Sequence, residues 1–182
     1  NATGKSIRFR VCHLLATLLK EMPEDLDLDE VVLEEIERAI MDRAYDRLPR
    51  IRAVAAEALG FLQNPEDSTS KESVIGVLLK MASFDASASV RKACVTSIAI
   101  TKETLQCLLQ RTRDVNLEVR LAAIRGIALK VEPTMLTKEQ RDSLLEQGLR
   151  DRTENVRKAT AEYLLRDGWF HGYCGGDIFE FA

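Results

Sequence analysis

One hydrophobic pattern recurs along the chain, and it is anchored on a Val-Arg or Ile-Arg dipeptide. Five copies follow one another at intervals of roughly 30–45 residues, the length of a two-helix repeat. In four of them an Asp lies six residues before the Arg. These pairs are Asp46 and Arg52, Asp85 and Arg91, Asp114 and Arg120, and Asp151 and Arg157. The first copy, Ile7-Arg8, has Ala2 where the Asp would stand.

The residues that follow each dipeptide have the spacing of one face of an α-helix. Counted from the Val or Ile as zero, positions 3, 4, 7 and 8 lie on the same face as position zero. Small residues at positions 3 and 4 would let a neighbouring helix approach closely. Arg10, at position 3 of the first copy, is the exception. The face residues are Arg10, Val11, Leu14 and Leu15; Val54, Ala55, Ala58 and Leu59; Ala93, Cys94, Ser97 and Ile98; Ala122, Ala123, Gly126 and Ile127; and Ala159, Thr160, Tyr163 and Leu164.

A second apolar helical segment precedes each Asp. The unit is therefore a helix, a short turn that begins at the Asp, and a second helix that begins near Val-Arg. Such units bury their apolar faces only against their neighbours, so the sequence predicts an all-α fold, a single cooperative α-solenoid of about four helix pairs plus flanking helices. The expected elements are the second helix of a truncated repeat at 5–21, full repeats at 29–63, 71–99, 101–131 and 137–167, and a loop with the start of a further helix at 168–182.

The composition, 46% hydrophobic and 30% charged, is typical of a folded chain and excludes a disordered one. Every stretch without a charged residue is shorter than the roughly 17–25 residues of a membrane-spanning helix, so we expect no membrane association. The four widely spaced cysteines indicate buried free thiols in a reduced, intracellular protein. Because the chain begins at Asn1 without a signal-peptide pattern, we interpret it as a fragment of a longer polypeptide.

The net charge of −3 is unevenly distributed. Residues 21–37 hold nine acids and no base, so the rest of the chain carries an excess of six positive charges. Basic residues cluster around the turns between paired helices, and stacked repeats would align them into a ridge that could hold phosphates. The alternative is that about half of them belong to internal Asp–Arg pairs or cover apolar surface. We expect no interleaving of aromatic and basic residues that would support base stacking, which favours duplex backbone over single strands.

The sequence offers no catalytic constellation. His171 and Cys174 have the spacing of half a zinc site, but a second ligand pair is missing, and His13 lies alone within a helical pattern. Neither GxxxxGK[ST] nor GxGxxG occurs. We therefore expect a protein that is not an enzyme and that has no cofactor, no metal site and no small-molecule substrate.

The positions of the Asp and Arg residues resemble those of HEAT repeats, a family in which the Arg bridges toward the Asp of an adjacent repeat. The resemblance implies a structural ladder made of Asp46, Arg52, Asp85, Arg91, Asp114, Arg120, Asp151 and Arg157. More specific stretches, at 7–24, 46–67, 101–122 and 149–169, resemble the N-terminal HEAT region of the condensin G subunit (CAP-G) family. This resemblance covers about residues 5–180.

The condensin resemblance implies a non-enzymatic subunit that supports mitotic chromosome condensation. Its implied partners are a central segment of the CAP-H type kleisin and the phosphate backbone of double-stranded DNA, with the SMC ATPases reached indirectly through the complex. The implied location is the nucleus and the condensed chromosomes, and also the cytoplasm. The turn at 46–49 matches the basic turn of the family, which implies a DNA contact for Arg47. Further DNA contacts are carried over to Lys5, Arg10, Arg50, Lys92, Arg113 and Arg152.

A second hypothesis remains open at this point. A HEAT array could serve only as a protein scaffold, of the transport-receptor or phosphatase-scaffold type. Reversal of basic turn residues separates the two hypotheses, because it would weaken DNA binding only under the first.

Overall fold

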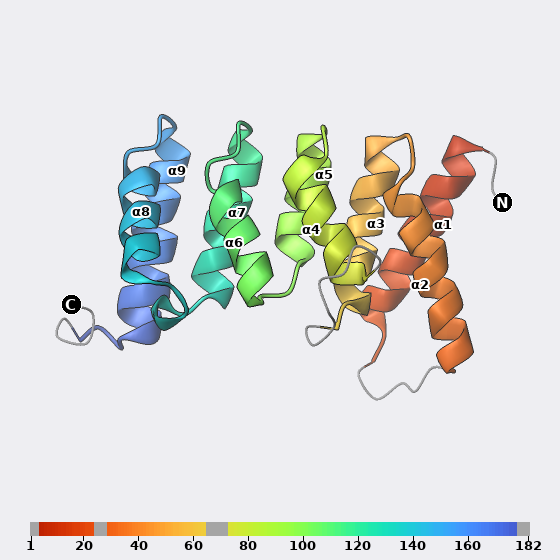
Figure 1. Ribbon diagram of the computed structural model, residues 1–182, viewed down its shortest axis with the longest axis horizontal. Helices are drawn as coiled ribbons and strands as arrows, with labels where there is room; N and C mark the ends of the chain where they lie inside the picture. The colour runs from red at the N-terminus through yellow and green to blue at the C-terminus, as the bar shows by residue number, and fades with distance from the viewer. Residues whose placement is uncertain (1–3, 24–28, 65–72, 178–182) are drawn as a thin grey trace. The chain divides into compact units, whose positions relative to one another are not determined.

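The computed structural model describes residues 4–23, 29–64 and 73–177. All regular secondary structure in these ranges is helical, and they contain no strand (Figure 1). The predicted all-α fold class is therefore confirmed. The further helix expected to begin within 168–182 falls in part on residues 178–182, which lie outside the described ranges.

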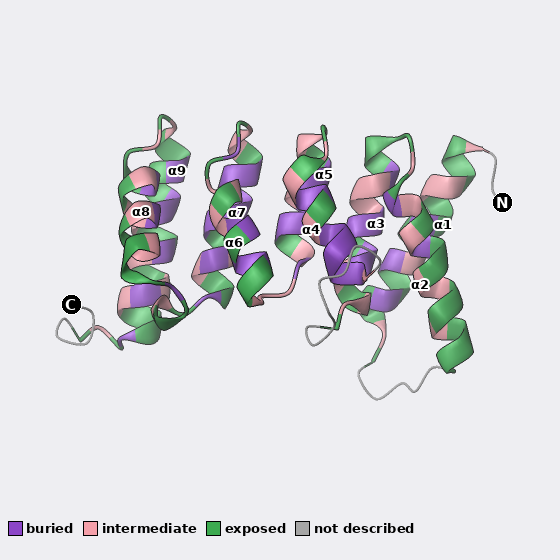
Figure 2. Ribbon diagram, viewed as in Figure 1, coloured by how far each residue is buried: buried purple, intermediate pink, exposed green. Residues whose placement is uncertain are grey.

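The chain divides into two compact units, 1–104 and 105–182. The helices of unit 1 are α1 (Lys5–Glu21), α2 (Glu30–Ala44), α3 (Pro49–Leu62), α4 (Val74–Phe84) and α5 (Ala88–Ser97). In this unit α3 packs against both α1 and α5, while α2 packs against α3 and α4. Ile40, Ile51, Leu59, Ile75 and Leu78 are fully buried between these helices. Burial is concentrated in α3, α4 and α5, whereas most of α2 is exposed (Figure 2).

Unit 2 is built in the same way around the second helix of each pair. Helix α6 (Lys102–Arg111) begins at the end of unit 1 and continues into unit 2. The other elements of unit 2 are α7 (Leu117–Lys130), the short 3₁₀-helix η1 (Pro133–Met135), α8 (Lys138–Leu149), α9 (Glu154–Lys158) and the π-helix η2 (Ala159–Tyr173). Helix η2 packs against α7 and α8. The side chains of Ile124, Ile127, Leu164 and Trp169 form the buried centre of the unit.

Several helices begin where the sequence supplies a capping group. The side chains of Asp29 and Ser73 accept hydrogen bonds from Val31 N (2.9 Å) and Gly76 N (3.0 Å). Pro49 occupies the first turn of α3, where its missing N–H costs nothing. Asn116 caps α7, and Thr137 forms a capping box at the start of α8. These caps stabilise the helix starts.

Helix η2 runs beyond the boundary expected at 167. Its last turn has the π-helical pattern, because Cys174 N donates to Trp169 O, five residues back, at 3.0 Å. A Cβ atom on Gly168 would lie 2.9 Å from the carbonyl oxygens of Ala128 and Tyr163. The glycine is therefore required for the close approach of η2 to α7, and it does not end the helix.

The buried face of α1 differs from the face that the repeat pattern indicated. Val11 and Leu14 are 49% and 59% exposed, whereas Cys12, Ala16 and Leu19 are buried. The face is thus shifted by one residue, about 100° around the helix, toward α3. In the other copies the expected positions lie in or beside the core, apart from Tyr163, which is half exposed.

The four cysteines, Cys12, Cys94, Cys107 and Cys174, are free and buried. Burial raises the pKa of the Cys12 thiol to about 11, so it stays protonated at neutral pH. None of the described helices combines the length and the apolar character that crossing a bilayer requires.

Candidate nucleic-acid interface

The same two contacts close each turn between paired helices. The Asp side chain accepts a hydrogen bond, at 2.8–3.0 Å, from the backbone N–H two residues further on. The Arg six residues after the Asp donates from Nη1 to the carbonyl of that Asp, again at 2.8–3.0 Å. The turns closed in this way begin at Asp46, Asp85, Asp114 and Asp151. This recurring geometry explains why Asp and Arg keep a fixed spacing.

Within each unit, ion pairs also join successive repeats. Arg52 binds both carboxylate oxygens of Asp85, from Nε at 2.7 Å and from Nη2 at 2.8 Å. Arg120 Nε lies 2.9 Å from Asp151 Oδ2. Arg8 Nε donates to Asp46 Oδ2 at 2.6 Å, and this ion pair was not among those expected from the sequence. Because the turn before Arg8 lacks an Asp, only the Ile7-Arg8 dipeptide could have indicated this pair.

These contacts change the acidity of the ladder carboxyls. The hydrogen bond from Arg8 holds the pKa of Asp46 below its usual value, and the Leu48 N–H acts in the same direction. Burial tends to raise the pKa of Asp85, but the bonds from Arg52 and from Ser87 N outweigh it, so this pKa is also lowered. Both carboxylates are therefore ionised at neutral pH, and their arginine partners are engaged within the protein.

Three basic residues outside the ladder meet at one corner of unit 1. The Arg8–Asp46 pair joins the first turns of α1 to the turn before α3, which carries Arg47. Lys5 lies one turn before Arg8 on the same face of α1. On the adjacent α3, the Arg50 guanidinium stacks 4.3 Å from the centre of the Phe9 ring. We call Lys5, Arg47 and Arg50 the basic corner.

The basic corner is a concentration of accessible positive charge. Its three side chains are exposed, and none of them is paired with an acid among the residues that the structure describes. Phe9 holds the guanidinium of Arg50 in place through a cation–π contact, a role that the sequence analysis did not assign. Three exposed cations without counter-charges suit a ligand that carries several phosphates.

The remaining candidates for DNA contact are distributed differently. Arg113 and Arg152 both lie in unit 2, where Arg113 donates to Ser143 Oγ (3.0 Å) and Arg152 donates to the carbonyl of Val115 (3.1 Å). Both are exposed. Arg10 is exposed on the side of α1 that faces away from α3, and Lys92 is half-buried on α5. These two therefore do not belong to the basic corner.

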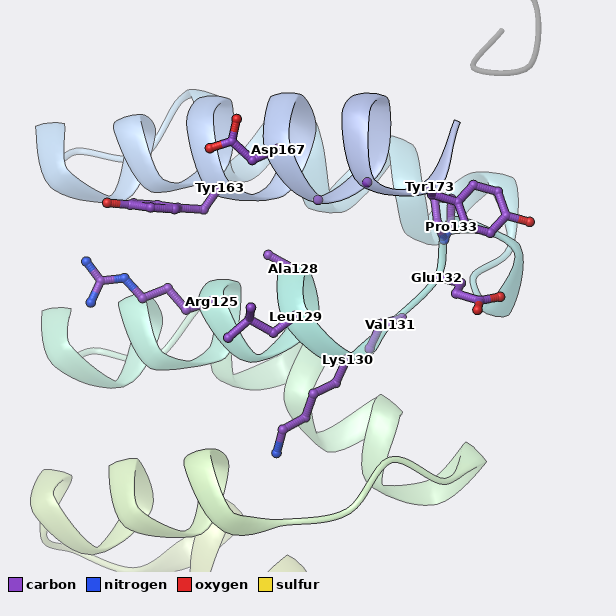
Figure 3. A pocket seen from close by; sticks show the side chains of 12 residues that line it. Arg125, Ala128, Leu129, Lys130, Val131, Glu132, Pro133, Tyr163, Asp167 and Tyr173 are labelled. Carbon is purple, nitrogen blue, oxygen red and sulfur yellow. The ribbon is translucent and has the colours of Figure 1, made fainter. Parts of the chain in front are cut away.

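Unit 2 also contains a hollow of about 860 Å³ between α7 and η2 (Figure 3). Its walls carry Arg125 and Leu129 from α7 and Tyr163 from η2, and Pro133 and Tyr173 lie at its other end. The Arg125 guanidinium lies 5.4 Å from the centre of the Tyr163 ring. The hollow thus extends along the two helices and is bordered by aromatic rings. Its lining is more apolar than polar, although Arg125, Lys130, Glu132 and Asp167 also line it.

Comparison with known proteins gives consistent matches along the chain. A family model described as HEAT repeats matches residues 37–128. The chain is 36% identical to condensin complex subunit 3 of Homo sapiens over 179 residues, which is 98% of this chain and 17% of that protein. It is 30% identical to condensin complex subunit 3 of Saccharomyces cerevisiae over 193 residues, 97% of this chain and 18% of that protein. The chain thus spans about a sixth of the length of these relatives.

A solved structure is similar over the whole chain. The crystal structure of the S. pombe condensin Cnd3–Cnd2 subcomplex matches with a TM-score of 0.87 and 26% identity, covering 100% of this chain and 23% of that one. The resemblance to the condensin G subunit that the sequence motifs indicated is confirmed by these matches.

Proposed function

Since the chain belongs to the HEAT-repeat family, we propose that it forms part of a condensin subunit that binds a partner subunit and the backbone of duplex DNA. The similarity to condensin complex subunit 3 at 36% identity supports the assignment to the complex. The similar S. pombe structure is a complex of two condensin subunits, which supports a polypeptide partner. From the sequence motifs we take this partner to be the kleisin, and the setting to be the chromosomes of dividing cells.

The DNA proposal rests on a difference between two groups of basic residues, those that are paired with acids and those that are not. Arg8, Arg52 and Arg120 are engaged in the ladder, whereas Lys5, Arg47 and Arg50 are exposed at one corner without acidic partners among the described residues. Such side chains can approach phosphates with little loss of existing contacts. Phosphate contacts position DNA without reading its sequence, so binding would be independent of sequence and sensitive to salt.

The DNA proposal is tested by charge reversal at the basic corner. We expect the variant Arg47→Glu/Arg50→Glu to bind duplex DNA more weakly, and the slope of log affinity against log salt to fall by about two. Fluorescence anisotropy with a labelled duplex, in the presence of the co-expressed kleisin, measures both quantities. Arg38→Glu is the control for Arg47→Glu, because Arg38 is an exposed arginine of the same unit outside the corner. Equal losses of DNA affinity in Arg47→Glu and Arg38→Glu would contradict the assignment. Unchanged DNA binding in the double variant would favour the protein-only scaffold.

We place the partner polypeptide in the hollow between α7 and η2. An elongated apolar hollow with aromatic borders suits an extended chain segment with apolar side chains. Leu129, on its wall, is 84% exposed and is therefore available to a partner. We expect Leu129→Glu to reduce co-purification of the kleisin without unfolding the protein. Val115→Glu is the control, since Val115 is equally exposed in the same unit but does not line the hollow. Undiminished recovery with Leu129→Glu would exclude this site.

A further inference from the structure

The residue before the ladder Asp differs between the two units. In unit 1 it is aromatic, Tyr45 before Asp46 and Phe84 before Asp85. In unit 2 it is an arginine, Arg113 or Arg150. The aromatic side chains of unit 1 are 59% and 84% exposed, so they are not part of the core. Two exposed rings at the same repeat position raise the question of what they contact.

Both rings line one hollow of about 340 Å³ between the ends of α2 and α4. Val77 and Met81 supply apolar side chains from α4, and both are buried. The Arg52–Asp85 ion pair also borders the hollow. Its volume lies at the lower end of the range for small-molecule sites, roughly 300–1,000 Å³, so it suits a flat ring system better than a folded partner.

The charges around this hollow favour an anionic ligand. Lys80 lines it, with Nζ 5.5 Å from the centre of the Tyr45 ring, and the exposed Arg47 follows Tyr45 in the same turn. Neither is paired with an acid among the described residues. The two nearby carboxylates, Asp46 and Asp85, are already bound by Arg8 and Arg52. The surroundings of the hollow are therefore cationic, and its carboxylates are neutralised.

We propose that this hollow binds an unpaired base of single-stranded nucleic acid, which stacks on Tyr45 or Phe84 while Arg47 and Lys80 contact the flanking phosphates. Aromatic platforms beside cations are the usual means of holding single strands without sequence preference, because every base has a π face. The expectation that aromatic and basic residues are not interleaved is wrong at this turn, because Tyr45 stands between Arg43 and Arg47 in the sequence. The fold adds Phe84 and Lys80 by bringing the end of α4 to the end of α2. The proposal goes beyond duplex binding at the basic corner.

The test compares single-stranded and duplex DNA on the full chain. A fluorescent 20-nucleotide oligothymidylate and a duplex of the same length are titrated with Tyr45→Ala/Phe84→Ala. We expect affinity for the oligothymidylate to fall roughly tenfold or more, since each stacked base contributes about a factor of ten. Duplex affinity and the salt slope should stay unchanged, because no charge is removed. Tyr45→Phe and Phe84→Tyr should retain binding, because each keeps an aromatic ring. Phe61→Ala is the control for loss of an exposed aromatic side chain, since Phe61 is exposed in the same unit but does not line this hollow.

Direct evidence comes from photo-crosslinking with 5-iododeoxyuridine, which should attach to Tyr45 or Phe84. The proposal is overturned if the wild-type chain does not bind the oligothymidylate, or if the ring variants bind it normally. It is also overturned if single-stranded and duplex affinities fall together, or if the variants lose only the kleisin, since the hollow would then be a protein-docking surface. Arg50→Glu tests the basic corner alone, so failure of duplex binding can be distinguished from failure of this proposal.

Discussion

A ladder carboxylate can accept hydrogen bonds both from its own turn and from an arginine of the preceding repeat. Asp85 accepts a backbone N–H of its own turn and a bidentate bond from Arg52 of the preceding repeat. Its side chain is almost completely buried, so Arg52 would lose its counter-charge in a low-dielectric environment if this carboxylate were removed. We therefore expect the Arg52–Asp85 pair to be needed for the stability of unit 1.

This arrangement predicts that the stability of unit 1 depends on pH. The pKa values of Asp46 and Asp85 are lowered in the folded state, so both carboxylates favour folding above the unfolded Asp pKa of about 3.9. This contribution should be lost as the pH falls from there through the lowered folded pKa values. Asp85→Asn should cost roughly 3 kcal/mol at pH 7 and flatten the acid dependence of the free energy of unfolding. Urea denaturation between pH 7 and pH 2.5 measures both effects.

The exposed Asp42 supplies the control for this measurement. Asp42→Asn changes the same functional group on α2, at a position outside the ladder and open to solvent. It should leave the stability at pH 7 and its acid dependence nearly unchanged. Equal effects of Asp42→Asn and Asp85→Asn would mean that the ladder makes no special contribution.

At the scale of helices, the contact between α3 and α5 depends on a glycine. A Cβ atom on Gly60 would lie 2.6 Å from Ser97 Cβ and 3.2 Å from Ser97 O. Gly60→Ala should therefore destabilise the protein by about 1–3 kcal/mol, although alanine normally favours a helix. Thermal unfolding of a double-mutant cycle with Ser97→Gly tests this, since removal of the Ser97 side chain should recover part of the loss. If the changes in stability of the two single variants simply add in the double variant, Gly60→Ala does not clash with the Ser97 side chain.

The sequence was sufficient to predict the helical pairs, because the Asp–Arg spacing and the apolar face repeat in register. It was not sufficient at α1, where the core-facing side is set by packing against α3 and lies one residue away from the repeat pattern. It also failed at Gly168. The sequence indicates only that a glycine can end a helix there, whereas the structure shows that it lets η2 approach α7 closely. Both differences arise from contacts with neighbouring helices, which the local pattern does not contain.

At the scale of the whole molecule, the candidate sites were only partly accessible from sequence. The motif at 46–49 pointed to Arg47, but the grouping of Arg47 with Lys5 and Arg50 depends on the Arg8–Asp46 pair, which joins distant segments. The hollow with Tyr45 and Phe84 likewise exists only once α2 and α4 are in place. The sequence therefore identifies single basic residues and the turns that carry them. Which of these residues lie close together depends on the fold.

The last prediction concerns cooperativity along the array. In a solenoid, stability is the sum of the intrinsic stabilities of the repeats and of nearest-neighbour terms, so damage to one repeat can spread to others. Ala159 is buried in unit 2, and Ala159→Glu would place an unpaired charge there at a cost of several kcal/mol. If the chain is one cooperative array, hydrogen exchange should accelerate in α4 and α5 of unit 1 as well as in α7. Glu162→Gln, an exposed change on the same helix, should have no such effect. Normal protection of α4 and α5 together with loss in α7 would mean that the two units unfold independently.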